Sequence, residues 1–393
     1  MTDRSLYGTT AIVGVGESDY RDLYRNPHHG KNLEDIAVEA VRRAVADAGL
    51  TLDDVDGIVA AGVPGVGYEG VMYRTGLQNA RFLAHYPLGG RLCPHALGQA
   101  AMAVHHGMAD VVVAFNAVDF RSRGMQFGGD TPKGPPPVTA DDLYGLAYGM
   151  TSPGAQYGLM FSRYMQLYGV GEVDLARIAV TQRQWAALNP NAIFQDRITV
   201  DEYLAARPIV RPLRLYDYCL VNDGAAAYVI TSAERARDLP RPPVLIGGVA
   251  SRANVRPYYA DEDFWADASR SLRHDLLDPL GLSIDDIDSV QVYDNFSPSV
   301  VWVLEGFGFA PRGEALAWMA DGRTAPGGSL PVNTSGGMIA EAYLQGWNLH
   351  VEAVRQLRGE AGPRQIPDCS RILYAGLSAV PGASLLVKDG VPL

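Results

Sequence analysis

The sequence predicts an α/β fold built from two similar halves, and an internal repeat carries this prediction. Residues 49–59 read GLTLDDVDGIV and residues 281–291 read GLSIDDIDSVQ, with the apolar positions through residue 58 and all three Asp positions in register. Each copy follows a stretch of helical periodicity and runs into an apolar segment, so the repeated unit is helix, turn and buried strand. Solenoid repeats span only roughly 20 to 50 residues. The much wider spacing here therefore indicates two halves that face each other across a pseudo-twofold axis.

The elements of the first half follow from hydrophobic periodicity, from a helix-closing glycine and from apolar runs of strand length. A continuous apolar run such as residues 111–115 is typical of a strand that is buried on both faces. The expected elements are a strand at 10–15, an amphipathic helix at 33–48 closed by Gly49, a strand at 58–61, a helix at 97–106 and a strand at 111–115. This alternation of helices and strands predicts an α/β half.

The chain changes character between residues 121 and 157, where Gly, Pro, Tyr and Met are frequent and three prolines follow one another at 135–137. Long loops of this kind are uncommon unless they cover a site, so we expect a functional loop that closes over an apolar substrate. The α/β pattern then returns. The expected elements are helices at 161–168 and 173–188, strands at 225–231 and 244–250, a helix at 264–277, a strand at 290–292, helices at 299–306 and 343–357, and a strand at 372–377.

Composition and charge limit the classes of function that the chain can have. With 47% hydrophobic and 20% charged residues the chain can bury a large core, and its net charge of −11 without a basic run argues against nucleic-acid binding. No apolar run reaches the roughly 18 residues of a membrane span, and the N-terminus lacks the pattern of a signal peptide, so we expect a cytoplasmic protein. The three cysteines have no paired spacing, which predicts neither disulfides nor a metal site.

Three polar motifs stand out: the first directly precedes a predicted strand, the second directly follows one, and the third lies in the predicted loop of residues 321–337. Ligands of α/β proteins bind where strand ends and helix starts converge. The motifs read NDG at 222–224, YDNFS at 293–297 and NTSGG at 333–337, and Tyr343 follows six residues after the last motif. In this order, and with two repeated halves, the chain resembles the thiolase superfamily, specifically its branch of sterol carrier proteins and lipid-transfer proteins. That branch has His-Asp-Cys-Phe-Ser and Asn-Pro-Ser-Gly-Gly at the second and third motifs. The resemblance covers essentially the whole chain.

The resemblance implies a thiolase fold, in which duplicated α/β halves form a five-layered α-β-α-β-α core with an inserted loop domain. It implies an N-terminal half of residues 1–118 completed by 217–238, a loop domain of residues 119–216 that covers the substrate, and a C-terminal half of residues 239–393. Members of this superfamily dimerise through the core, so a homodimer is expected.

The chain departs from the thiolase pattern at the residues that carry thiolase chemistry. Tyr293 and Tyr343 stand where the branch has its two catalytic histidines, and the position of the nucleophilic cysteine falls on Gly90, three residues before Cys93. The late cysteine of thiolases is missing from residues 375–382. An acyl-enzyme mechanism needs an activated thiolate and a proton acceptor with a near-neutral pKa. A standard thiolase reaction is therefore not expected.

The two tyrosines resemble those of the thiolase-like aldolases of bacterial steroid side-chain degradation. This resemblance implies retro-aldol cleavage of a β-hydroxyacyl-CoA of the 17-hydroxysteroid C20 carboxyl-CoA class, which gives a 17-ketosteroid and propionyl-CoA. The substrate is then a CoA thioester, and no cofactor or metal is implied in this chain. The related aldolases also work with a small partner that contains an OB fold and a zinc ribbon, so such a partner is expected here.

Two proton-transfer groups suffice for this reaction. We expect Tyr343 as the base and Tyr293 as the acid, with the reverse assignment still open, and the predicted helix start at Tyr343 would favour a phenolate there. The enolate oxygen needs donors, for which the amide of Asn295 and the backbone N–H groups of residues 335–337 are candidates. The oxyanion candidates of that last segment are Ser335, Gly336 and Gly337. The candidates for contact with CoA phosphates are Arg207, Arg211, Arg214, Arg252 and Arg256.

Two other functions remain open from the sequence. One is a thiolase of the acetyl-CoA acetyltransferase type that uses Cys93 as its nucleophile, and the other is a non-catalytic acyl-CoA or sterol-binding subunit. Substitution of Cys93 would abolish the first activity and leave an aldolase nearly intact. A binding subunit would keep its ligand affinity without either tyrosine and would release no product.

Overall fold

The computed structural model describes residues 6–62, 67–87, 92–127, 145, 147–150, 152–252, 264–377 and 380–393. Strands in these ranges form one hydrogen-bonded sheet in the order β3-β2-β4-β7-β1-β8-β11-β10-β9. The strands are β1 (Thr10–Glu17), β2 (Gly57–Gly62), β3 (Phe82–Pro87), β4 (Val111–Asp119), β7 (Asp223–Ser232), β8 (Val244–Ser251), β9 (Ser289–Val292), β10 (Arg371–Gly376) and β11 (Gly382–Lys388). A separate two-stranded sheet pairs β5 (Pro208–Val210) with β6 (Leu213–Arg214).

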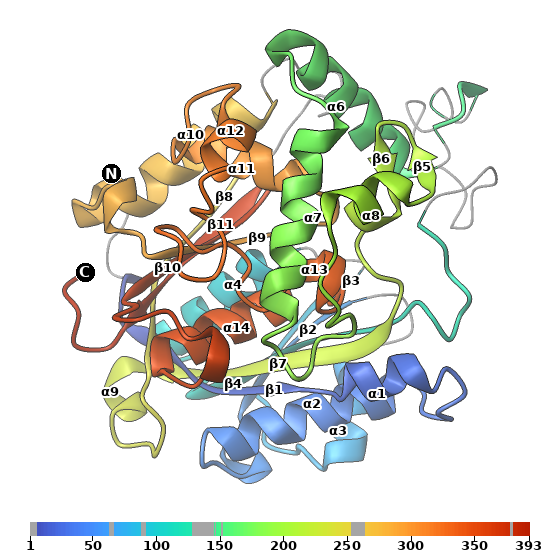
Figure 1. Cartoon of the computed structure of the whole chain (residues 1–393). Coiled ribbons are helices and arrows are strands. Elements are labelled where there is room, and N and C mark those ends of the chain that lie inside the picture. Colours follow the sequence, from blue (N-terminus) through green and yellow to red (C-terminus); the bar gives the residue numbers. More distant parts are fainter. Residues whose placement is uncertain are drawn as a thin grey trace.

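Helices cover both faces of this sheet and fill the space between its two halves (Figure 1). The helices are α1 (Tyr20–Arg25), α2 (Leu33–Asp47), α3 (Tyr68–Thr75), α4 (Cys93–His105), α6 (Pro153–Tyr168), α7 (Glu172–Ala186), α8 (Val200–Ala205), α9 (Ala233–Ala236), α10 (Phe264–Leu277), α11 (Pro298–Phe307), α12 (Ala315–Met319), α13 (Gly337–Ala340) and α14 (Trp347–Arg358). Among the described residues, no helix combines the length and the apolar character that a membrane crossing requires.

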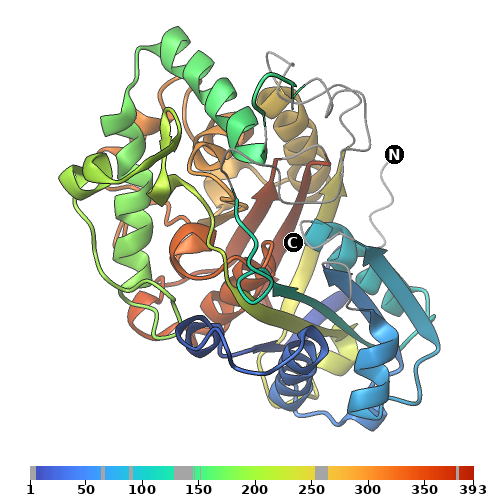
Figure 2. The same cartoon turned by 90° about the vertical axis from the view of Figure 1, so that its right-hand side faces the viewer.

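The sheet consists of two half-sheets that meet at a narrow junction. Strands β1 and β8 share only the residue pairs Ala11–Leu245 and Ile12–Val244. Helices α4 and α14 contact strands of both half-sheets, α2 lies on the outer face of the first half, and α10 and α11 lie on the outer face of the second. Figure 2 shows the half-sheets and their outer helices from the side. This arrangement is the predicted five-layered α-β-α-β-α core.

Both copies of the sequence repeat fold in the same way. In the first copy Asp54 accepts a hydrogen bond from the N–H of Thr51 at 2.9 Å, and in the second Asp286 accepts one from the N–H of Ser283 at 2.8 Å. Each bond belongs to a capping box on a single 3₁₀ turn, and this turn leads into β2 in the first copy and into β9 in the second. The repeated Thr or Ser and Asp therefore encode the turn between helix and strand.

The last Asp of the repeat joins each strand to its neighbour. Asp56 accepts hydrogen bonds from the N–H groups of Asp110 and Val111, both at 2.8 Å, at the start of β4. Asp288 does the same for residues 370–371, at 2.7 and 2.9 Å, at the start of β10. Strands β2 and β4 are parallel, as are β9 and β10, so the carboxylates align each pair at one end.

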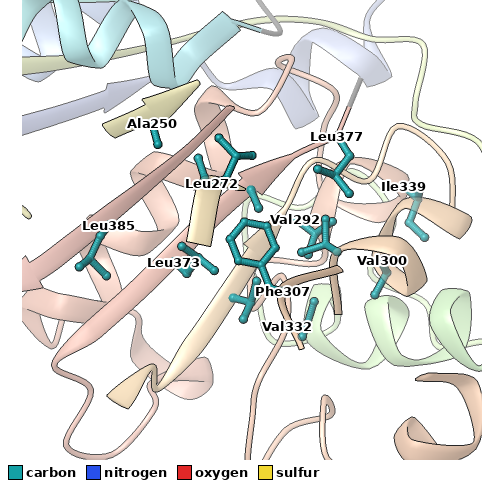
Figure 3. Packing of buried hydrophobic residues seen from close by; sticks show 14 of the residues in the cluster. Ala250, Leu272, Val292, Val300, Phe307, Val332, Ile339, Leu373, Leu377 and Leu385 are labelled. Atoms are coloured by element: carbon teal, nitrogen blue, oxygen red, sulfur yellow. The ribbon is translucent and has the colours of Figure 1, made fainter. Parts of the chain in front are cut away.

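Apolar side chains of the second half hold β9 in place. Leu272 of α10 and Phe307 of α11 belong to the same buried cluster as Val292 of β9 and Leu373 of β10 (Figure 3). All four side chains are fully buried. Burial of a side chain of this size contributes about 1.5 to 3 kcal/mol. This packing fixes the end of β9, directly before Tyr293.

The segment between β4 and β7 carries α6, α7, α8 and the small β5–β6 sheet, which stand together in Figure 1. Helix α7 contacts both α12 and α13, so this segment packs against the second half close to the third polar motif. About half of the expected loop of residues 121–157 lies outside the described residues, and so does Gly90. The boundaries of the three predicted domains stay a prediction.

Candidate active site

The hydroxyl oxygens of Tyr293 and Tyr343 lie 2.9 Å apart and share a hydrogen bond. Tyr293 follows directly after β9, and Tyr343 lies in the connection between α13 and α14. Both side chains are nearly buried, with exposed fractions of 5% and 9%. The structure therefore brings together two phenols that are 50 residues apart in the chain.

Asn333 fixes the end of the strand from which Tyr293 emerges. Its Oδ1 accepts a hydrogen bond from the N–H of Val292 at 2.6 Å, and its Nδ2 donates one to the carbonyl of Val292 at 3.0 Å. The N–H of Tyr293 donates to the carbonyl of Ala375 at 2.9 Å. The backbone on both sides of the Tyr293 amide is thus held by hydrogen bonds, and these limit the positions open to the phenol.

Aromatic rings enclose Tyr343. The ring of Phe120 stacks against it with centroids 5.7 Å apart and an angle of 19°, and Phe127 meets it edge to face at 5.4 Å. Both phenylalanines belong to the segment that follows β4. The phenol therefore lies in an apolar environment, where water does not compete for its hydrogen bonds.

Helix α14 begins at Trp347, so the sequence-based prediction of a helix start at Tyr343 is wrong. Gln345 and Gly346 have φ angles of 55° and 89°, which interrupt the helical backbone before Trp347. Favourable charge at a helix N-terminus extends only over the first turn. The α14 terminus therefore does not supply the stabilisation that was expected for a phenolate at Tyr343.

The phenol of Tyr293 and the carboxyl of the adjacent Asp294 both hold their protons. Burial, followed by the adjacent hydroxyl of Tyr343, raises the pKa of Tyr293 well above the ordinary phenol value. Burial also raises the pKa of the neighbouring Asp294 carboxyl to about 8, although the N–H of Met338 donates to it at 2.8 Å. Near pH 7 the protein therefore presents a neutral proton donor at Tyr293.

The other predicted site residues have different surroundings. Asn295 is half-buried, and its Oδ1 accepts a hydrogen bond from the hydroxyl of Ser299 at 3.0 Å, which fixes the amide. The hydroxyl of Ser335 donates to Glu341 at 2.6 Å, and the N–H of Gly336 donates to the carbonyl of Asn333 at 2.8 Å. Both groups therefore have a partner inside the protein, and the oxyanion roles of Ser335 and Gly336 stay predictions. The oxyanion role of Asn295 stays a prediction as well.

Gly337 makes room for the carboxyl group next to Tyr293. A Cβ at this position would lie 2.2 Å from Oδ2 of Asp294, and the φ of 65° also favours glycine. The Gly337 backbone thus supports the second polar motif, and an oxyanion role for its N–H stays a prediction.

Cys93 is the first residue of α4 and is fully buried. Its thiol donates a hydrogen bond to the hydroxyl of Tyr374 at 3.0 Å. Burial raises the pKa of Cys93 above the ordinary thiol value, and this effect exceeds the opposing one of the Tyr374 hydrogen bond. The thiol is therefore protonated near pH 7, whereas a nucleophilic cysteine must be a thiolate.

Two of the five arginine candidates for contact with CoA phosphates form ion pairs. Arg214 is paired with Glu172, with 2.7 Å from Nε to Oε2, and Arg252 is paired with Asp275. Arg207 and Arg211 are exposed. Arg256 lies outside the described residues. Of the four described candidates, Arg207, Arg211 and Arg252 are exposed, and Arg207 and Arg211 lie in the segment that carries β5 and β6.

Sequence reasoning did not assign a role to the side chain that contacts the backbone of Tyr343. Oδ1 of Asn222 accepts a hydrogen bond from the N–H of Tyr343 at 2.7 Å. The NDG motif was visible in the sequence, but its partner lies 121 residues away. Phe120 and Phe127 were likewise missed, because no local pattern distinguishes them from core residues.

The chain is similar to known proteins over most of its length. The family described as thiolase C-terminal domain-like matches residues 260–384. The chain is 38% identical over 392 residues to a steroid side-chain-cleaving aldolase of Thermomonospora curvata, covering 97% of this chain and 98% of that protein. It is 35% identical over 391 residues to a 17-hydroxy-3-oxo-4-pregnene-20-carboxyl-CoA lyase of Mycobacterium tuberculosis, covering 97% and 100%.

A solved structure described as "Ltp2-ChsH2(DUF35) aldolase" has the same fold. It matches with a TM-score of 0.87 at 36% identity and covers 98% of this chain and 99% of that chain. Similarity of this extent, over the full length of two named aldolases or lyases and a solved aldolase, exceeds what a shared fold requires. The chain therefore belongs to the thiolase superfamily, in its branch of steroid side-chain-cleaving aldolases.

Proposed function

We propose that this chain cleaves the side chain of a 17-hydroxysteroid C20 carboxyl-CoA by retro-aldol chemistry, with Tyr343 as base and Tyr293 as acid. The 2.9 Å contact between the two buried hydroxyls is the observation that carries this proposal. The names of the two relatives support the substrate class. The buried, protonated thiol of Cys93 argues against the alternative of a thiolase that uses this residue.

The reaction moves one proton and breaks one carbon–carbon bond. The base removes the proton of the tertiary hydroxyl on C17, and the oxygen forms a carbonyl as the bond from C17 to C20 breaks. The electron pair of that bond passes to C20 and the thioester, which becomes an enolate. Protonation of C20 then gives propionyl-CoA beside the 17-ketosteroid. No covalent enzyme intermediate and no redox step are needed.

The contact between the phenols completes the proton cycle. Tyr293 holds its proton because its pKa is raised by burial, so it suits delivery of a proton to the enolate carbon. A proton taken up by Tyr343 then passes to Tyr293 across their shared hydrogen bond, which restores the starting state. The same bond stabilises a transient phenolate on Tyr343, because a donated hydrogen bond favours the charged form of its acceptor.

Asn295 is our candidate for stabilising the enolate oxygen. It lies two residues after Tyr293, and its Oδ1 is occupied by Ser299, so its Nδ2 group points away from that bond. An oriented amide donor at a developing oxyanion is worth about 3 to 4 kcal/mol in enzymes of known mechanism. The substrate thioester is then expected to lie on the Asn295 side of the phenol pair.

Two further observations support a proposal on how this chain assembles with other chains. Strand β3 is at the edge of the nine-stranded sheet, and Leu83 on it is 46% exposed, which suits pairing with a second copy of the chain. The related solved aldolase contains a second protein, named ChsH2 with a DUF35 domain. We therefore expect a homodimer that also binds a small subunit with an OB fold and a zinc ribbon.

The experiment measures propionyl-CoA and 17-ketosteroid released from 17-hydroxy-3-oxo-4-pregnene-20-carboxyl-CoA, with and without a small subunit of this kind. Loss of a general acid or base costs about 10²- to 10⁴-fold in rate, so Tyr343→Phe and Tyr293→Phe should each lower kcat by that order. Tyr203→Phe is the matched control, because this buried tyrosine donates to Asp217 at 2.6 Å outside the described site.

The proposal requires product release by the wild type and by Tyr203→Phe. It is wrong if the folded wild-type complex binds the steroid thioester and releases neither product, which would identify a binding subunit. It is also wrong if Tyr343→Phe keeps full activity.

A further inference from the structure

Two asparagines from the first half form hydrogen bonds with the backbone of the connection that carries Tyr343. The N–H of Tyr343 donates to Oδ1 of Asn222 at 2.7 Å, and the carbonyl of Leu344 accepts from Nδ2 of Asn116 at 2.9 Å. Both asparagines are fully buried. Side chains distant in sequence thus satisfy two backbone groups of this connection.

Asn222 and the two residues after it all contact Tyr343 or its immediate surroundings. Oδ1 of Asp223 accepts hydrogen bonds from the N–H groups of residues 121–122, at 2.9 and 3.1 Å, and so fixes the turn after Phe120, whose ring stacks on Tyr343. Gly224 leaves space for Leu344, since a Cβ there would lie 2.8 Å from Cδ2 of that leucine. The NDG motif therefore supports Tyr343 through its backbone, through the turn after Phe120 and through Leu344.

The NDG motif leads into a strand that is paired on both sides. Asp223 is the first residue of β7, which pairs with β4 on one side and with β1 on the other. The phenol of Tyr293, in contrast, emerges from β9 in the second half-sheet. The distance between the two hydroxyls thus depends on the contact between Asn222 and Tyr343, which crosses from one half to the other.

We propose that Asn222 is a positioning residue of the reaction: its amide oxygen holds the backbone of Tyr343 so that the two phenols stay within hydrogen-bond distance. This inference rests on the proposed function. Without the amide oxygen a buried N–H loses its acceptor, and the connection must move to satisfy it. Misplacement of a reacting group by about 1 Å can cost about 10²-fold in rate.

The test compares steady-state kinetics of Asn222→Ala with those of the wild-type complex. We expect kcat to fall by about 10- to 100-fold while KM stays within about threefold, because Asn222 acts on the base and not on substrate binding.

Two further variants separate positioning from general stability. Asn222→Asp keeps an oxygen at the acceptor position and should recover at least about tenfold in kcat over Asn222→Ala at pH 6, where a buried carboxyl is largely protonated. Thr231→Val is the matched control at the other end of β7, because it removes a part-buried hydrogen bond of 2.7 Å to the carbonyl of Asp110. It should lower the melting temperature and leave kcat unchanged.

The outcomes distinguish this inference from the proposed function. If Asn222→Ala stays folded with kcat within about threefold of the wild type while Tyr343→Phe is inactive, the positioning role is wrong and the function stands. If Tyr343→Phe is active, the function itself fails. Should Asn222→Ala not fold, Asn222→Ser takes its place, and a kcat for this variant equal to that of Thr231→Val would overturn the inference.

Discussion

The Cys93 thiol donates a hydrogen bond to the Tyr374 hydroxyl, and this contact separates the chain from enzymes that use a cysteine nucleophile. The two residues are 281 positions apart and both are buried. Burial keeps the thiol protonated. A cysteine at a helix start can be reactive when it is accessible and ionised, and Cys93 is neither.

Cys93→Ala should therefore leave aldolase activity within about threefold of the wild type, at a stability cost of about 1 kcal/mol for the lost thiol and its hydrogen bond. The assay is product release together with thermal unfolding. In the folded wild type, Cys93 should also resist alkylation by iodoacetamide. A loss of more than about 100-fold in a folded variant would favour thiolase chemistry over this prediction.

Gly346→Ala should impair both stability and catalysis. A Cβ at this position would lie 2.3 Å from Oη of Tyr374, 3.0 Å from Sγ of Cys93 and 3.1 Å from Cδ2 of Tyr293, and the backbone has a φ of 89°. We expect destabilisation of about 1 to 3 kcal/mol from backbone strain alone and a lower kcat because the ring of Tyr293 must move.

Gly359→Ala is the matched control for this substitution. Gly359 follows α14 with a φ of 76°, and a Cβ there would meet nothing within 4 Å. This variant should show the cost of strain without a change in kcat. Equal kcat values for the two variants would contradict the prediction.

Asp294 should make stability depend on pH. Its pKa is raised to about 8 in the folded state by burial, against 3.8 as the ordinary value. Between these values the folded protein holds a proton that the unfolded chain has released. The contribution to stability is thus complete below about pH 4 and is lost as the pH rises through 8.

Asp294→Asn removes this titration and retains an oxygen for the N–H of Met338. Between pH 6 and pH 8.5 the melting temperature of the wild type should therefore fall by a few degrees more than that of the variant. Thermal unfolding at both pH values measures the difference. Parallel melting curves for the two proteins at both pH values would show that Asp294 does not titrate in this range.

Leu83→Lys should weaken self-association. A charge on an exposed edge strand disfavours pairing with another strand. Light scattering after size exclusion should give a dimer for the wild type and a larger share of monomer for this variant. A wild-type chain that is monomeric at micromolar concentration would remove the basis for the prediction.

The sequence predicted the fold well because the repeat encodes local contacts. Thr51 with Asp54 and Ser283 with Asp286 are three residues apart, so their capping boxes can be read from the chain. The predicted start of α14 at Tyr343 is wrong, because this helix begins at Trp347. Helical periodicity continues through Tyr343, whereas the positive φ of Gln345 is visible only in the structure.

The site itself depends on contacts that sequence spacing does not reveal. Tyr293 and Tyr343 were identified through a family resemblance, not through a local pattern, since most tyrosines are packing residues. The contact of Asn222 with Tyr343 spans 121 residues and involves the backbone of one partner. Only the folded chain shows which of its buried asparagines meet a reacting residue.

The two copies of the repeat differ at the position of the proposed acid. At the offset that aligns residues 49–59 with 281–291, Tyr293 corresponds to Ala61, the fifth residue of β2. The turn and the strand were thus retained twice, but the phenol exists in one copy. The proposed mechanism therefore has a single reaction centre in each polypeptide, and the copy of the repeat without the phenol serves as part of its frame.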